Sequence, residues 1–169
     1  MMPARTQAQL FASAISSPIG ELQLITDGSA ILSLILDVDR RRNFAGEQVL
    51  MEADHPLLQR ASQQLHDYFS GRRHSFDLPL RPAGSIFQLK AWRELSRIPY
   101  GTTISYGEQA RRMGDSNKAR AVGAANGRNP LPVLIPCHRV IGASGALVGF
   151  SGGLKTKEFL LDLERQFAR

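Results

Sequence analysis

The residues best suited to carry out chemistry lie in one short stretch, NPLPVLIPCHRVIG, which spans residues 129–142. It holds Cys137, the only cysteine of the chain, followed directly by His138 and Arg139. A thiolate is a strong nucleophile, and nearby His and Arg side chains favour it by lowering the thiol pKa from about 8.5. The pattern leaves three roles open for Cys137: a small buried apolar residue, a metal ligand or a nucleophile.

The histidines give no support for a metal site. A structural zinc site needs four Cys or His ligands, whereas the histidines lie at positions 55, 66, 74 and 138 and form no ligand-spaced cluster with the cysteine. We therefore expect no bound metal, and no motif indicates another cofactor. Burial is the usual fate of a lone cysteine. However, Pro136 and Gly142 predict a sharp bend here, which favours a reactive thiol, and a Cys-His hydrolase remains an alternative.

The bulk composition excludes several classes of protein. The 169 residues suffice for one domain of ordinary size or two small ones, and an apolar fraction of 43% is enough to bury a core. No apolar run approaches the length of a membrane span, and the initial MMPARTQAQLF lacks the apolar centre of a signal peptide. One cysteine excludes an internal disulfide. We expect a soluble, cytoplasmic protein that does not enter a membrane.

The charge is unevenly distributed along the chain. Residues 1–80 carry seven Arg against nine acidic residues, a net charge of −2, and residues 81–169 carry fourteen Lys or Arg against six, a net charge of +8. A basic half beside a slightly acidic one indicates that the second half faces a polyanion such as nucleic acid. On charge alone, a basic surface that only aids solubility is an equal alternative.

The amino-terminal half predicts a small sheet followed by a helix. Three short runs with partial alternation, separated by turn signals, predict an antiparallel three-stranded sheet: residues 10–16, 20–28 and 30–38. The polar residues 38–53 predict a loop with one short element. Apolar residues at spacings of three and four predict a helix over 54–71, which Asp54 caps and Gly71 ends in the left-handed conformation.

The carboxy-terminal half predicts mostly helices. After a linker, Ser85 caps a first helix over 86–98, and Ser105 with Glu108 forms a capping-box pattern at the start of the next. The further helices expected are residues 105–114, 118–126 and 155–167. The second and third of the four are joined by about four residues, a helix-turn-helix pattern.

The helix over 118–126 has features that suit a nucleic acid. Small residues recur along it and allow a close approach to another surface: Ala119, Ala121, Gly123, Ala124 and Ala125. Arg120 lies near its amino terminus, where the helix dipole favours phosphate. By itself, this pattern fits an alanine-rich packing helix with a solvated Arg equally well.

Several motifs taken together resemble one known family. PCHRVIG, preceded by ISYGEQA and KARAVGAANGRNP and followed by GFSGGLKTKEFLLDLE, is similar to the O6-alkylguanine-DNA alkyltransferases, also called methylated-DNA–protein-cysteine methyltransferases. The resemblance runs without a gap from about Phe87 to Glu164, and the amino-terminal part resembles the family only in outline. It implies an α/β (α+β) fold with three parts: an amino-terminal α/β domain over 1–80, a linker over 81–85 and a DNA-binding and alkyl-transfer domain over 86–169.

The resemblance also implies an activity. Members repair DNA by irreversible, single-turnover transfer of the alkyl group from O6-alkylguanine to their own cysteine, which is Cys137 here, and O4-alkylthymine is a further candidate substrate. The implied partner is double-stranded DNA with an alkylated guanine, bound through the minor groove by a monomer that needs no cofactor. A non-catalytic alkyltransferase-like lesion binder is the alternative, but such proteins lack the cysteine.

The resemblance assigns roles around the cysteine. His138 activates the thiol through a water and pairs with Glu164 on the last helix, Tyr106 gives a proton to the departing guanine, and Asn129 braces the segment before Cys137. A carboxylate that orients a histidine follows the logic of a catalytic triad.

The resemblance assigns further residues to DNA and to the base. Arg120 fills the base stack when the nucleotide flips out, and the small residues Ala119, Ala121 and Gly123 allow close approach to the minor groove. The residues that line the guanine pocket are Val148, Phe150, Ser151 and Gly152. Some members have tyrosine where this chain has Phe150, which can pack against the base but offers no hydroxyl to it. Some members bind zinc through amino-terminal cysteines that this chain lacks.

Overall fold

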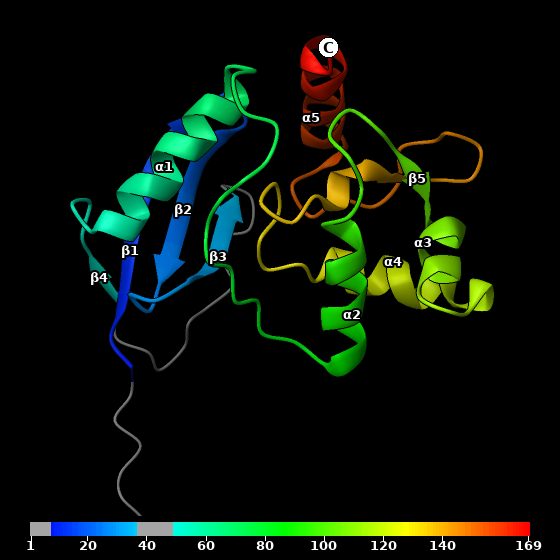
Figure 1. Cartoon of the computed structure of the whole chain (residues 1–169), viewed down its shortest axis with the longest axis horizontal. Helices are drawn as coiled ribbons and strands as arrows, with labels where there is room; N and C mark the ends of the chain where they lie inside the picture. Colours follow the sequence, from blue (N-terminus) through cyan, green and yellow to red (C-terminus); the bar gives the residue numbers. More distant parts are fainter. Residues whose placement is uncertain (1–7, 37–48) are drawn as a thin grey trace, which may run out of the picture.

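A four-stranded sheet forms the amino-terminal side of the molecule (Figure 1). The computed structural model describes residues 8–36 and 49–169. The strands are β1 (Leu10–Ser17), β2 (Gly20–Thr26), β3 (Ile31–Leu36) and β4 (Val49–Met51), in the order β3-β2-β1-β4. The antiparallel pairing of β1 with β2 and of β2 with β3 confirms the predicted meander.

The fourth strand was not predicted as part of the sheet. β4 pairs in parallel with β1, Leu10 opposite Val49 and Ala12 opposite Met51. A parallel pairing joins residues far apart in the chain, and three residues are too few to show a period, so the sequence carried little signal for it. β4 is the short element expected within residues 38–53, and residues 38–48 of that prediction lie outside the described residues.

Helix α1 (Pro56–Phe69) covers one face of the sheet and buries Leu58, Ala61, Leu65 and Tyr68. The prediction that Asp54 caps it is wrong: the cap is His55, whose Nδ1 accepts from the Leu57 N–H at 3.2 Å. Pro56 is the reason, because proline is favoured at the first helical position and makes the preceding residue the cap. Gly71 follows the helix with φ of 78° and confirms the predicted left-handed end.

Helix α2 (Ile86–Leu95) begins at a complete capping box between Ser85 and Gln88. The predicted helix over 86–98 is three residues too long, because Pro99 disfavours a helical conformation for the residue before it. Trp92 on this helix is 2% exposed, and its Nε1–H donates to the carbonyl of Ala125 at 2.8 Å. This bond ties α2 to the later helix α4.

Two short helices follow, α3 (Tyr106–Arg112) and α4 (Ala119–Gly127), joined through the 3-10 turn η2 (Ser116–Lys118). Ser105 caps α3 through the Glu108 N–H at 3.0 Å. The second half of the predicted capping box does not form, since the Glu108 carboxylate pairs with Arg111 and Arg112. The two charged side chains offer this carboxylate stronger, charge-assisted bonds than a backbone N–H does.

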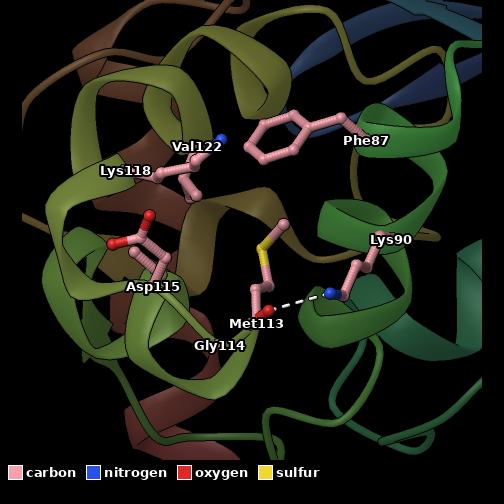
Figure 2. Close-up of a pocket in the computed structure, with 8 residues that line it drawn as sticks. Phe87, Lys90, Met113, Gly114, Asp115, Lys118 and Val122 are labelled. Carbon is pink, nitrogen blue, oxygen red and sulfur yellow. Dashed lines mark hydrogen bonds between the residues drawn. The ribbon is translucent and has the colours of Figure 1, made fainter.

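A hollow of about 180 Å³ lies among α2, α3 and α4 (Figure 2). Lys90 crosses its edge and donates to the Met113 carbonyl at 2.8 Å, at the carboxy-terminal end of α3. Lys118 lies over the Phe87 ring, 5.7 Å from its centre. A cation at a helix carboxy terminus is favoured by the helix dipole. The hydrogen bond from Lys90 to the Met113 carbonyl therefore fixes where α3 ends relative to α2.

The chain then returns toward the sheet side of the molecule. Residues 130–136 form a turn, Cys137–Arg139 form the 3-10 turn η3, and β6 (Val140–Ile141) pairs in parallel with β5 (Ile104–Ser105). The sharp bend predicted at the cysteine is therefore confirmed, since Cys137 lies in η3. The bend follows from Pro136, whose ring disfavours a helical conformation for Ile135.

The last helix, α5 (Leu154–Phe167), closes the core. Leu160 and Leu163 on its predicted apolar face are buried. They join one cluster that also contains residues of the sheet, α1, α2 and the turn around Cys137. The sheet and the helical part thus share a core. Over residues 8–36 and 49–169, no helix is both long enough and apolar enough to cross a membrane.

Gly71 offers a test of how α1 ends against α5. A Cβ at Gly71 would lie 2.4 Å from the Phe167 ring, and the φ of 78° strains any other residue. We expect Gly71→Ala to lower the free energy of unfolding by about 1–3 kcal/mol, measured by urea denaturation. Gly127→Ala is the control, since its Cβ would meet nothing within 4 Å. Equal stability of Gly71→Ala and wild type would contradict this account.

Candidate active site around Cys137

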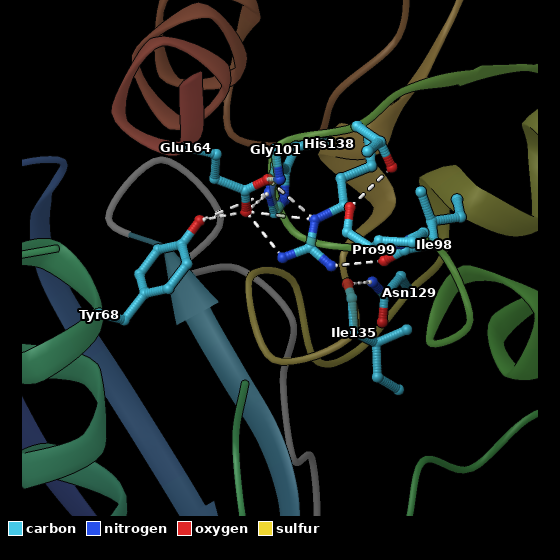
Figure 3. Close-up of polar contacts among 10 residues, drawn as sticks. Tyr68, Ile98, Pro99, Gly101, Asn129, Ile135, His138 and Glu164 are labelled. Carbon is cyan, nitrogen blue, oxygen red and sulfur yellow. Dashed lines mark hydrogen bonds and ion pairs between the residues drawn. The ribbon is translucent and has the colours of Figure 1, made fainter. Parts of the chain in front are cut away.

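Cys137 lies at the start of η3 and is 6% exposed. The turn before it is held by Asn129, which is 2% exposed. The Asn129 side chain accepts from the Leu131 N–H at 2.9 Å and donates to the Ile135 carbonyl at 2.8 Å (Figure 3). Because both ends of the turn are bound to one buried side chain, the position of Cys137 is set by Asn129, as the predicted bracing role requires.

The carboxylate of Glu164 collects hydrogen bonds from three other parts of the chain (Figure 3). His138 Nε2 lies 2.7 Å from Glu164 Oε1, and Arg139 Nη2 lies 2.8 Å from the same oxygen. The Tyr68 hydroxyl of α1 also donates to Oε1, at 2.8 Å. The Gly101 N–H donates to Oε2 at 3.1 Å. The structure therefore brings the predicted pair of His138 and Glu164 into direct contact.

This contact determines which nitrogen of His138 can act as a base. An ionised carboxylate only accepts hydrogen bonds, so Nε2 carries the proton and Nδ1 keeps its lone pair. Burial lowers the pKa of His138, against the opposing effect of Glu164, so the ring is neutral at neutral pH. Nδ1 is buried and has no hydrogen-bond partner among the described residues. A neutral imidazole with its lone pair on Nδ1 is a competent proton acceptor.

Glu164 stays ionised despite its burial. Burial alone raises the pKa of its carboxyl, but the hydrogen bonds from His138 and Arg139 outweigh burial and hold the pKa well below its usual range. Arg139 also donates to the Ile98 carbonyl at 2.7 Å. The charge of Arg139 thus balances the carboxylate, and the histidine need not be protonated to do so.

A lysine and a tyrosine lie on the other side of the cysteine. The Tyr106 hydroxyl donates to the Val148 carbonyl at 2.9 Å. Lys157, which is fully buried, donates to the carbonyls of Val140 at 2.6 Å and Val148 at 2.8 Å. Burial and the nearby Cys137 thiolate raise the pKa of Tyr106. Burial lowers the pKa of Lys157, and Cys137 opposes that shift. Both side chains therefore share one electrostatic environment with the thiol.

Several members of this site were not predicted from the sequence. Tyr68 was assigned only to the apolar face of a helix, and Arg139 was expected to act on the thiol pKa rather than on Glu164. Gly101 contributes only a backbone N–H, which leaves no trace in a side-chain pattern. Lys157 could have been found from the helical spacing, because it lies three residues before Leu160 and seven before Glu164, on the buried face of α5.

The expected base-pocket residues lie on the segment between β6 and α5. Val148 is 44% exposed, Phe150 packs against the shared core, and Ser151 and Gly152 are half-buried. A Cβ at Gly152 would lie 2.4 Å from the side chain of Leu36, the last residue of β3. The structure thus places this segment against the sheet, and its role as a base pocket stays a prediction.

The expected DNA-contacting residues lie on α4. Arg120 and Ala121 are exposed, whereas Ala119 and Gly123 are half-buried. A Cβ at Gly123 would lie 3.6 Å from the Tyr106 ring. That is an ordinary van der Waals distance, so Gly123 lies beside Tyr106 without being required there for space.

The fold and the site define a class of protein: a mixed α/β chain in which a buried cysteine, a neutral histidine and a glutamate adjoin a pair of short helices. Comparison with known sequences identifies the class further. The profile described as the DNA binding domain of 6-O-methylguanine DNA methyltransferase matches residues 86–166, and the profile of its ribonuclease-like domain matches residues 10–82. The chain belongs to the 6-O-methylguanine DNA methyltransferase family.

Individual relatives agree over almost the whole chain. A methylated-DNA–protein-cysteine methyltransferase of Methanosarcina acetivorans is 41% identical and is aligned over 92% of this chain and 98% of its own. The constitutive one of Bacillus subtilis is 40% identical, over 92% and 95%. The crystal structure of Mycobacterium tuberculosis OGT in complex with DNA is similar with a TM-score of 0.84 and 41% identity, over 93% and 94% of the two chains.

Glu164→Gln tests the charge balance of the site. The change leaves the buried guanidinium of Arg139 without its counter-charge, so we expect the free energy of unfolding to fall by about 3–5 kcal/mol at neutral pH in urea denaturation. Because folding lowers the pKa of Glu164, its stabilisation is present above the unfolded pKa and is lost as the pH falls below it. The variant should therefore lose less stability on acidification than wild type.

Glu158→Gln is the control for this change. Glu158 lies on the same helix with an exposed side chain, and we expect its replacement to alter stability by less than about 0.5 kcal/mol. An equal effect of the two substitutions would refute the charge balance proposed for Glu164.

Proposed function

We propose that this protein repairs DNA by moving the alkyl group from O6 of guanine to Sγ of Cys137, once per molecule. The proposal is supported above all by His138, the residue after Cys137, which is hydrogen-bonded to Glu164 through Nε2. Its Nδ1 is therefore available as a base. Membership of the family and the names of the relatives support the same activity.

The reaction begins with the thiol proton. His138 Nδ1 takes it, directly or through one water, while Glu164 holds the other ring nitrogen and stabilises the imidazolium that forms. The buried ammonium of Lys157 favours the thiolate electrostatically. Because His138 is neutral before the reaction, it can accept the thiol proton of Cys137 at neutral pH.

The displacement itself needs little from the protein. The thiolate attacks the alkyl carbon, the S–C bond forms, and the bond between that carbon and O6 breaks. A saturated carbon develops no oxyanion, so no oxyanion hole is required. The guanine leaves as an anion and takes a proton from Tyr106, whose raised pKa keeps the phenol protonated until then. The thioether is stable, so the chain offers no route back to the free thiol.

The DNA side of the proposal rests on α3 and α4, taken together as a helix-turn-helix. The exposed Arg120 and Ala121 form a small, positively charged edge that suits the minor groove. The reacting base must leave the duplex to reach a buried cysteine. Arg120 fills the space left in the stack, and the flipped guanine lies against the segment from Val148 to Gly152.

Two other functions are disfavoured. A non-catalytic lesion binder has no use for a cysteine activated in this way, and a Cys-His hydrolase is disfavoured by the family to which the chain belongs. The monomeric state, the cytoplasmic location and activity on O4-alkylthymine stay predictions.

Labelled methyl transfer tests the function. Duplex DNA with O6-methylguanine labelled on the methyl group should transfer about one label per protein molecule, located on Cys137 by mass spectrometry, and Cys137→Ser should abolish transfer. Binding of lesion DNA without transfer would instead support the non-catalytic binder. Repeated turnover on an ester would support the hydrolase.

Arg120→Ala separates DNA handling from chemistry. Because Arg120 fills the space that the flipped nucleotide leaves in the stack and does not act on the thiol, we expect the variant to repair duplex DNA about tenfold or more slowly and to react with free O6-benzylguanine at the wild-type rate. Arg165→Ala, an exposed Arg on α5, is the control and should leave both rates unchanged. Equal losses on duplex and free base would exclude the role proposed for Arg120.

A further inference from the structure

Tyr68 connects the amino-terminal part of the chain to the site of the reaction. It lies in α1, is fully buried, and points its hydroxyl at the carboxylate of Glu164 (Figure 3). The hydroxyl donates to Oε1 at 2.8 Å and lies 3.4 Å from His138 Nε2. Oε1 of Glu164, which holds the His138 ring, thus also accepts a hydrogen bond from a residue 70 positions before the histidine.

Packing accounts for the ring of Tyr68 but not for its hydroxyl. The ring contacts Phe69, Phe76 and Tyr100, with centroid separations of 5.4, 5.4 and 6.1 Å. A phenylalanine would fill the same space and avoid the desolvation of a polar group. The presence of the hydroxyl is therefore explained by its hydrogen bond to Glu164.

We propose that Tyr68 is a positioning residue for the alkyl transfer, one that sets how strongly Glu164 holds the Nε2 proton of His138. The proposal rests on the proposed function and deepens it. A hydroxyl bound to Oε1 shares the negative charge of that oxygen and reduces its pull on the imidazole proton. The amino-terminal part would thereby tune the base that activates Cys137.

The groups around His138 determine the direction of the effect. Glu164 and Lys157 face it from α5, Arg139 and Cys137 from η3, and Tyr68 from α1. Glu164 alone favours the imidazolium before the thiol ionises, whereas the two cations disfavour it. Removal of the Tyr68 donor strengthens the one group that favours protonation. The pKa of His138 should then rise, and the ring should be protonated over more of the neutral range.

The test is the pH profile of methyl transfer from duplex O6-methylguanine. For Tyr68→Phe we expect the acid limb of the rate to move up by about one pH unit, and the rate at neutral pH to fall severalfold. Replacement of Tyr68 by 3-fluorotyrosine, a stronger donor of nearly the same size, should move the limb down. A merely structural role would lower the rate without moving the limb.

Tyr100→Phe is the matched control. It removes a hydroxyl from the aromatic ring that packs edge-on against Tyr68, and that hydroxyl is buried with no hydrogen-bond partner among the described residues. We expect no shift of its acid limb. Titration of the His138 ring by NMR gives a second readout that does not need activity, and it should show the same rise in pKa for Tyr68→Phe.

The outcomes distinguish this inference from the function it rests on. If wild type transfers no methyl group, the proposed function is wrong and the inference falls with it. If wild type transfers the group while Tyr68→Phe keeps both the wild-type acid limb and the wild-type His138 titration, the function stands and the role of Tyr68 is refuted. A shift shared equally by Tyr100→Phe would also refute it.

Discussion

A buried carboxylate places the strongest constraint on this structure. An ionised carboxyl is costly to bury unless charged and polar groups surround it. Glu164 is 1% exposed and is satisfied only because α1, the turn at Gly101 and η3 all deliver donors to it. Those three segments and α5 must therefore meet in the folded state. The same convergence brings Glu164 to Nε2 of His138, so the requirement for stability also assembles the base.

Two different side chains, an amide and an ammonium, hold the chain on either side of Cys137. On one side Asn129 ties the turn before Cys137 through its amide. On the other side the ammonium of Lys157 donates to the carbonyls of Val140, in β6, and of Val148, in the loop between β6 and α5. A lysine used in this way supplies both a scaffold and a positive charge beside the thiol. Replacement of Lys157 by an apolar residue would remove both contributions at once.

Local patterns in the sequence predicted much of this arrangement. The caps at Ser85 and Ser105, the end of α1 at Gly71 and the apolar face of α5 depend on residues a few positions apart, so they could be read directly. The convergence on Glu164 could not, because Tyr68 and Gly101 meet it only after the chain has folded. The motif around Cys137 identified His138 and Glu164 through resemblance, whereas Arg139 shows its role only in three dimensions.

The single tryptophan has a consequence for how this protein can be observed. Trp92 is buried between α2 and α4, and its indole N–H is bound to the backbone of the helix that carries Arg120. Ultraviolet emission from the chain at long excitation wavelengths therefore originates at one place, beside the helix pair. A displacement of α4 changes the polarity and hydrogen bonding around that indole. The molecule thus contains an intrinsic optical reporter of the state of its helix pair, with no dye to attach.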